Sequence, residues 1–105
     1  MSMESGPNQE SMERDVLVDA LKTKGIDDVE ARELLVAWTE KQEQKVETIG
    51  TREAQIQFEI DRAELYIEAG FKDDGIQALE DALTIATNEG LEDLVKLIEE
   101  RLSTP

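Results

Sequence analysis

Apolar residues recur every three or four positions through the C-terminal half of the chain, which is the spacing of one face of an α-helix. Two such runs adjoin, one ending before Gly70 and the other beginning at Asp74. Gly70 can take the positive φ that ends many helices, and Asp74 with Gln77 has the spacing of a capping box. A connection this short predicts two antiparallel helices. The repeating positions are Ile56, Ile60, Ala63 and Ile67 in the first helix and Ile76, Leu79, Leu83 and Ala86 in the second.

The N-terminal half predicts two further helices with narrower apolar faces. The first covers about residues 12–24 and ends at Gly25, and the second follows Asp27, which forms another capping box with Glu30. Trp38 lies on the apolar stripe of the second helix, which favours a place in the core over one on a partner-binding surface. The expected buried positions are Val16, Leu17, Ala20 and Leu21 in the first helix and Val29, Ala31, Leu34, Leu35 and Trp38 in the second.

The helical pattern weakens between residues 39 and 51. Residues 39–45 are polar throughout, and most of the pairs at i,i+4 spacing carry like charges, which disfavours a helix. Gly50 and Thr51 either form a turn, with Thr51 capping the next helix, or belong to one long helix over residues 28–69. The second alternative costs about 1 kcal/mol for the glycine, so the pattern favours the turn.

With a last helix over residues 91–102, the sequence predicts an all-α fold. It is a compact bundle of about five helices with an antiparallel hairpin in the C-terminal half. Residues 1–11 have little to bury and are expected to form a disordered tail. Residues 12–105 are expected to form a single helical domain, because a chain of 105 residues suffices for one modest core. Within this domain, residues 12–50 hold the N-terminal helices and residues 51–102 hold the C-terminal helices.

The charge of the chain narrows the classes of partner. It has 26 acidic and 11 basic residues, which give a net charge of −15. This charge repels nucleic-acid phosphates and anionic lipid, so neither nucleic acid nor a membrane surface is an expected partner. It favours a basic protein partner, although acidity also serves solubility alone. There is no cysteine, no secretory signal and no apolar run of membrane-spanning length, so the expected location is cytoplasmic.

The residue types present give little support for catalysis. Histidine and cysteine are absent, which removes the commonest general base, the thiolate nucleophile and the usual zinc ligands. Adjacent acidic residues such as Asp73 and Asp74 point in different directions on a helix and suit helix starts better than a pocket. A calcium loop centred on Gly75 fails, because Gly70 and Lys72 would stand at ligand positions. We therefore expect no enzyme activity, no metal and no cofactor.

The hairpin resembles a tetratricopeptide repeat. Tyr66 lies four residues before Gly70, where that motif has its first-helix aromatic residue, and Ala63 lies on the small position before it. In the second helix, three residues fall on the small, large apolar and small positions of the motif, namely Gly75, Leu79 and Ala82. The resemblance covers about residues 59–102, which is one repeat and the first helix of another.

The chain also departs from this motif. Glu59 stands where the family often has tryptophan, Arg62 where it has leucine, and Thr87 where a proline commonly ends the unit. Repeat proteins normally need about three units to bury a continuous core. One unit must therefore be covered by the N-terminal helices or by a second copy of the chain.

The resemblance implies a non-enzymatic module whose helical groove receives a peptide or a helix from a protein partner, which the acidic surface suggests is basic. The expected partner-binding residues are Tyr66, Ile67, Phe71 and Leu79, although each also suits a core position. The alternative is a self-associating structural protein, a homodimer that buries the exposed repeat face between two copies.

Overall fold

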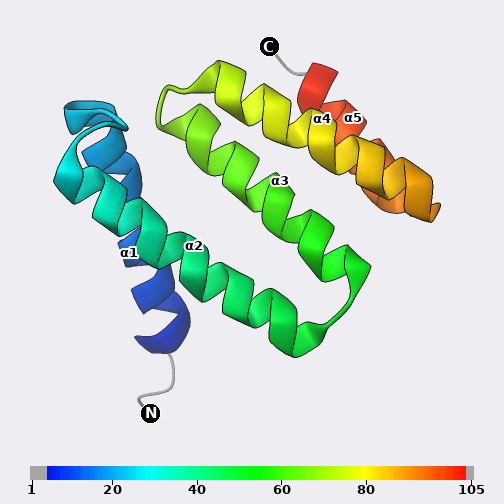
Figure 1. The fold of residues 1–105 in the computed structure, drawn as a ribbon, viewed down its shortest axis with the longest axis horizontal. Helices are drawn as coiled ribbons and strands as arrows, with labels where there is room; N and C mark the ends of the chain where they lie inside the picture. The colour runs from blue at the N-terminus through cyan, green and yellow to red at the C-terminus, as the bar shows by residue number, and fades with distance from the viewer. Residues whose placement is uncertain (1–4, 104–105) are drawn as a thin grey trace. The chain divides into compact units, whose positions relative to one another are not determined.

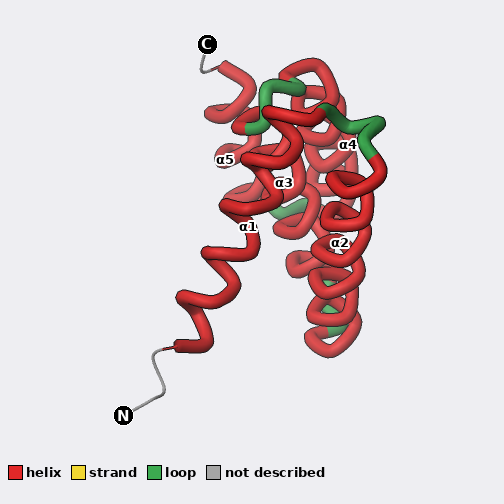
Figure 2. The backbone as a smooth tube through the Cα atoms, turned by 90° about the vertical axis from the view of Figure 1, so that its left-hand side faces the viewer, coloured by secondary structure: helices red, strands yellow, loops and turns green. Residues whose placement is uncertain are grey.

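The computed structural model describes residues 5–103, and within them it consists of five α-helices and no strand (Figures 1 and 2). The all-α prediction is therefore confirmed. The described chain divides into two compact units, one up to Lys41 and the other from Gln42 onward. The helices are α1 (Ser5–Lys24), α2 (Val29–Ile49), α3 (Arg52–Glu68), α4 (Lys72–Glu89) and α5 (Glu92–Ser103).

The first unit contains α1 and most of α2, joined by a turn at Gly25. Leu17 and Leu21 of α1 and Ala31 of α2 are almost fully buried. Ion pairs link the two helices at both ends: Lys24 binds Glu30 near the turn, and Lys41 Nζ lies 2.8 Å from Glu13 Oε1. The hydrogen bond and the negative charge of Glu30 raise the pKa of Lys24 above its ordinary value.

Two predictions about this unit are wrong. Val16 and Val29 were expected in the core, but their side chains are 56% and 72% exposed. Both lie at the edge of a narrow apolar stripe, and Leu17, Leu21 and Ala31 take the interior positions. The cap of α2 is Asp28 rather than Asp27, because Asp28 Oδ2 accepts a hydrogen bond of 3.0 Å from the Ala31 N–H.

Helix α1 begins at Ser5, whereas the sequence placed its start near Met12. Pro7 therefore lies inside the helix. A proline is nevertheless tolerated in the first turn of a helix, because its missing N–H would have no intrahelical acceptor there. Part of the expected tail, residues 5–11, is therefore helical, and residues 1–4 lie outside the described residues.

The second unit contains the predicted hairpin, α3 and α4, with α5 packed against α4 (Figure 1). Its core is a cluster of small and branched aliphatic side chains. Gly75 brings α3 and α4 into close contact, because a Cβ built on it would lie 2.5 Å from Ile67 Cγ1 and 2.8 Å from the Ala63 carbonyl oxygen. The buried cluster comprises Ile56, Ile60, Ala63, Ala78, Leu79, Ala82, Ala86 and Ile98.

The turns of this unit lie where the sequence predicted them, but one of the predicted helix caps is wrong. Helix α2 ends before Gly50, and Thr51 caps α3 by accepting a 3.1 Å hydrogen bond from the Ala54 N–H, so the turn is confirmed. Gly70, with φ of 94°, follows α3 as predicted. Helix α4, however, begins at Lys72, and Phe71 at its N-cap supplies no side-chain hydrogen bond. The capping box proposed for Asp74 is therefore wrong, and Asp74 lies inside the first turn.

Helix α3 has a second buried face that the apolar pattern did not indicate. Phe58 is 8% exposed and Leu65 is fully buried, although neither belongs to the stripe that contains Ile56 and Ile60. Arg62 lies between them in sequence, with its guanidinium carbon 5.8 Å from the centre of the Phe58 ring. The same guanidinium donates to Glu59 at 2.8 Å, so the charge on this face is locally paired.

Candidate functional site

The structure brings together two of the four residues expected to contact a partner. Ile67, near the end of α3, is 39% exposed, and Leu79 of α4 is buried directly below the same surface groove. Tyr66 and Phe71 are half-buried and do not line this groove. Their backbones close the α3–α4 turn instead, since the Phe71 N–H donates to the Tyr66 carbonyl at 2.8 Å.

The groove with Ile67 lies where α3 ends, α4 begins and α5 ends. It encloses about 510 Å³ and is called the apolar groove below. Ile67 and Ile76 form its wall, and both are accessible, while Leu79 closes its floor. The complete lining consists of Glu64, Ile67, Glu68, Lys72, Ile76, Leu79, Arg101, Leu102 and Ser103.

Charges of both signs surround the apolar groove. Arg101 Nε of α5 lies 2.5 Å from Glu64 Oε2 of α3, and this ion pair ties the two helices together beside the groove. Lys72 and Glu68 add one charge of each sign to the lining. The groove can therefore hold an apolar side chain and still offer hydrogen-bonding groups to either charge at its rim.

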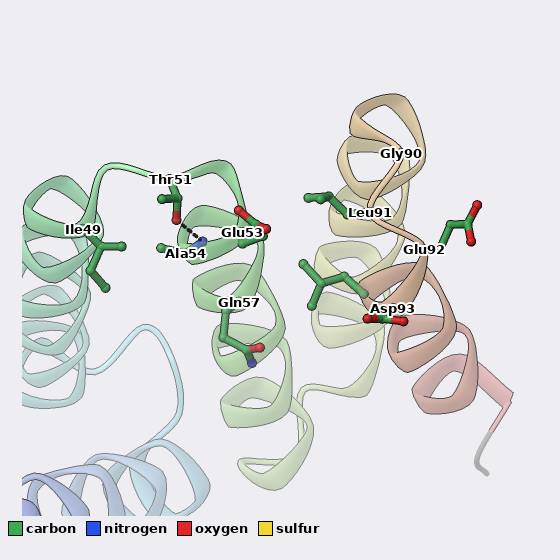
Figure 3. Close-up of a pocket in the computed structure, with 10 residues that line it drawn as sticks. Ile49, Thr51, Glu53, Ala54, Gln57, Gly90, Leu91, Glu92 and Asp93 are labelled. Atoms are coloured by element: carbon green, nitrogen blue, oxygen red, sulfur yellow. Dashed lines mark hydrogen bonds between the residues drawn. The ribbon is translucent and has the colours of Figure 1, made fainter.

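A second groove lies at the opposite ends of α3 and α5, where both helices begin (Figure 3). It encloses about 770 Å³ and is called the acidic groove below, because its lining has three carboxylates and no lysine or arginine. Figure 3 shows Leu91 pointing toward α3, whereas Glu92 points away from it. The lining consists of Ile49, Thr51, Glu53, Ala54, Gln57, Gly90, Leu91, Glu92, Asp93 and Leu94.

The first unit carries a shallower apolar stripe on α2. Val29 and Val36 stand seven residues apart on one face of the helix and are 72% and 53% exposed. Arg32, Glu33 and Glu40 flank them, and the concavity encloses about 410 Å³. This surface consists of one helix only, without a second wall.

Sequence reasoning identified part of the apolar groove and missed the acidic groove. Ile76 was recognised as an apolar position and residue 102 as the end of the last helix, but the place of Ile76 and Leu102 beside Ile67 depends on how three helices pack. The acidic groove joins residues 49–57 with residues 90–94, which lie far apart in sequence. The only local signal was the pair of acidic residues at the start of α5, and that pattern alone is explained by the helix dipole.

The chain matches no family model, no curated protein and no solved structure in the comparisons made. None of the helices within residues 5–103 is long and apolar enough to cross a membrane. Over the same residues, no group of three or more histidine, cysteine, aspartate or glutamate side chains is arranged to hold a metal ion.

Proposed function

We propose that the protein is a non-enzymatic interaction module whose apolar groove receives a peptide or a helix from a protein partner. The observation that carries this proposal is the exposure of Ile67 in a concave site that also presents Ile76 and Leu102. An apolar side chain of the partner would be removed from water there, which is the main source of affinity in helix-in-groove recognition. The net charge of −15 favours a basic partner and speeds its approach.

We further propose that the hairpin packs in the manner of a tetratricopeptide repeat. Three small residues at the expected positions support this proposal: Ala63 and Ala82 are fully buried, and Gly75 allows α4 to approach the backbone of α3. Small residues at these positions let two helices pack closely along their length. The module would then correspond to one repeat followed by the first helix of another.

The test is a peptide-display selection on the immobilised protein, followed by calorimetric affinities of the selected peptides. Ile67→Gln removes the apolar wall and should weaken their binding about tenfold, as expected for a central apolar contact. Val36→Gln on α2 is the matched control, because it changes another exposed aliphatic residue and should leave the affinities unchanged. Circular dichroism of both variants checks that they remain helical. Selected peptides that bind the Ile67→Gln variant as tightly as the wild type would refute the proposed site.

Self-association is a second candidate function, and the exposed stripe on α2 favours it. Val29 and Val36 present aliphatic surface that a second copy of the chain could cover. Sedimentation velocity over a hundredfold range of concentration, with Val36→Glu as the disrupting variant, separates the two functions. A mass that rises with concentration in the wild type alone supports the homodimer. A constant monomer mass rejects it.

A further inference from the structure

We propose that the acidic groove is a second binding site, separate from the apolar groove, for a short basic peptide segment that carries an aliphatic anchor. In this site, lysine or arginine side chains of the segment reach Glu53 and Asp93, and its aliphatic side chain packs against Leu91 and Leu94. Binding at this site requires only a segment that carries basic side chains and one aliphatic side chain. It does not depend on occupation of the apolar groove.

The carboxylates of the acidic groove are uncompensated. The side-chain carboxylates of Glu53, Glu92 and Asp93 accept no hydrogen bond and form no ion pair within the described part of the chain. The adjacent cation, Arg52, is already engaged, since its guanidinium lies 3.7 Å from Glu89 and donates to Gln55 at 2.8 Å. A cationic side chain entering the groove would therefore meet unpaired negative charge.

Capping and the helix dipoles offset only part of the negative charge of these carboxylates. The cap of α3 is supplied by Thr51, so Glu53 is not needed for it. Two helix N-termini together contribute roughly one positive charge, against three carboxylates, so the groove retains a negative potential. This excess also argues against an anionic ligand, although helix N-termini alone would attract one.

The groove offers an apolar contact as well as charge. Ile49 is 62% exposed at one wall, and Leu91 and Leu94 are half-buried, with their inner surfaces packed against the core of the second unit. Figure 3 shows Ile49 and Leu91 both pointing toward α3 from opposite sides. An aliphatic side chain packed on Leu91 and Leu94 would lose water-exposed surface while flanking cations pair with the carboxylates of the groove. This combination selects a basic and aliphatic segment over a purely cationic molecule.

The test uses three probes at moderate salt: a fluorescent peptide of leucine flanked by lysines, the same peptide with serine in place of leucine, and spermine. The leucine peptide should bind, and its serine counterpart should bind at least about fivefold more weakly, because the anchor is lost. Spermine should not displace the leucine peptide at an equal charge concentration. Equal binding of the leucine and serine peptides would overturn the proposal, because charge alone would then explain the binding.

Two matched pairs of substitutions locate the site. Glu53→Gln with Asp93→Asn should weaken binding of the leucine peptide about tenfold, since two charge-assisted contacts are removed. Glu80→Gln with Glu99→Gln changes the net charge equally outside both grooves, and should alter the affinity less than about twofold. Similar losses in both double variants, or no binding to the wild type, would refute the acidic groove as a site. Ile67→Gln should leave this peptide's affinity unchanged, so the outcome is independent of the function proposed for the apolar groove.

Discussion

At the scale of single residues, Gly75 sets the distance between α3 and α4. Gly75→Ala would gain helix propensity, but the added methyl group must displace Ile67 and meets the Ala63 carbonyl oxygen, which is fixed in the backbone. Overpacking of this kind typically costs about 1–3 kcal/mol, so we expect a net loss of about 1–2 kcal/mol in the free energy of unfolding. Urea denaturation measures it. The exposed Gln77→Ala on the same helix is the control and should change stability little, and a stabilised Gly75→Ala protein would contradict close packing at this point.

The requirement for a small residue at Gly75 could be anticipated, because the resemblance to a repeat motif marks that position. The burial of Phe58 and Leu65 could not. Both lie outside the stripe defined by Ile56 and Ile60, and a helix covered on two sides shows no single apolar period. The error at Val29 has the opposite cause. Its apolar side chain falls on the predicted face, yet that face is too narrow to bury every member.

At the scale of elements, the junction between α2 and α3 depends on Thr51. Its hydroxyl accepts the Ala54 N–H, which would otherwise have no intrahelical partner. Thr51→Ala should therefore lower the free energy of unfolding by about 1 kcal/mol, the usual cost of losing an N-cap. Thr84→Ala provides the control, because the Thr84 hydroxyl donates to the Glu80 carbonyl within α4, and that bond adds little to a helix. Equal effects of the two changes in chemical denaturation would exclude a specific capping role for Thr51.

The helices themselves were largely predictable, because glycines mark their ends. Gly25, Gly50, Gly70 and Gly90 all have positive φ and all follow a helix. Residues 39–45 are helical within α2 despite their like-charged pairs. Such pairs cost only a few tenths of a kcal/mol each at the surface, which the continuation of the backbone hydrogen bonds can offset. The positions of the glycines therefore predicted the helix ends better than the like-charged i,i+4 pairs did.

At the scale of the whole molecule, neither groove could be located from the sequence alone. Each includes residues of both α3 and α5, which are separated by α4 along the chain, so its lining depends on tertiary packing. The sequence indicated the aliphatic character of Ile67 and Leu79 and the acidity of the surface. It could not show that Tyr66 and Phe71 lie outside the apolar groove, nor that Glu53 of α3 and Asp93 of α5 line one groove. These facts depend on which residues face each other across helices.

The net charge of −15 predicts how the stability of the protein responds to salt. The ion pairs of the described residues, such as Lys41–Glu13 and Arg101–Glu64, join partly exposed side chains and contribute little. Repulsion among the excess carboxylates should outweigh them, so adding NaCl should stabilise the fold by screening it. We expect the melting temperature to rise by several degrees between about 10 and 150 mM NaCl, over which the screening length falls from about 30 to 8 Å.

The Glu80→Gln and Glu99→Gln double variant tests whether repulsion between carboxylates sets this dependence of the melting temperature on salt. It removes two negative charges outside both grooves, so it should melt at a higher temperature than the wild type in low salt and respond less to added NaCl. Thermal unfolding followed by circular dichroism gives both quantities. A melting temperature that falls with salt would mean that the ion pairs stabilise the chain more than the excess charge destabilises it. The excess negative charge would then not lower the stability of the free protein.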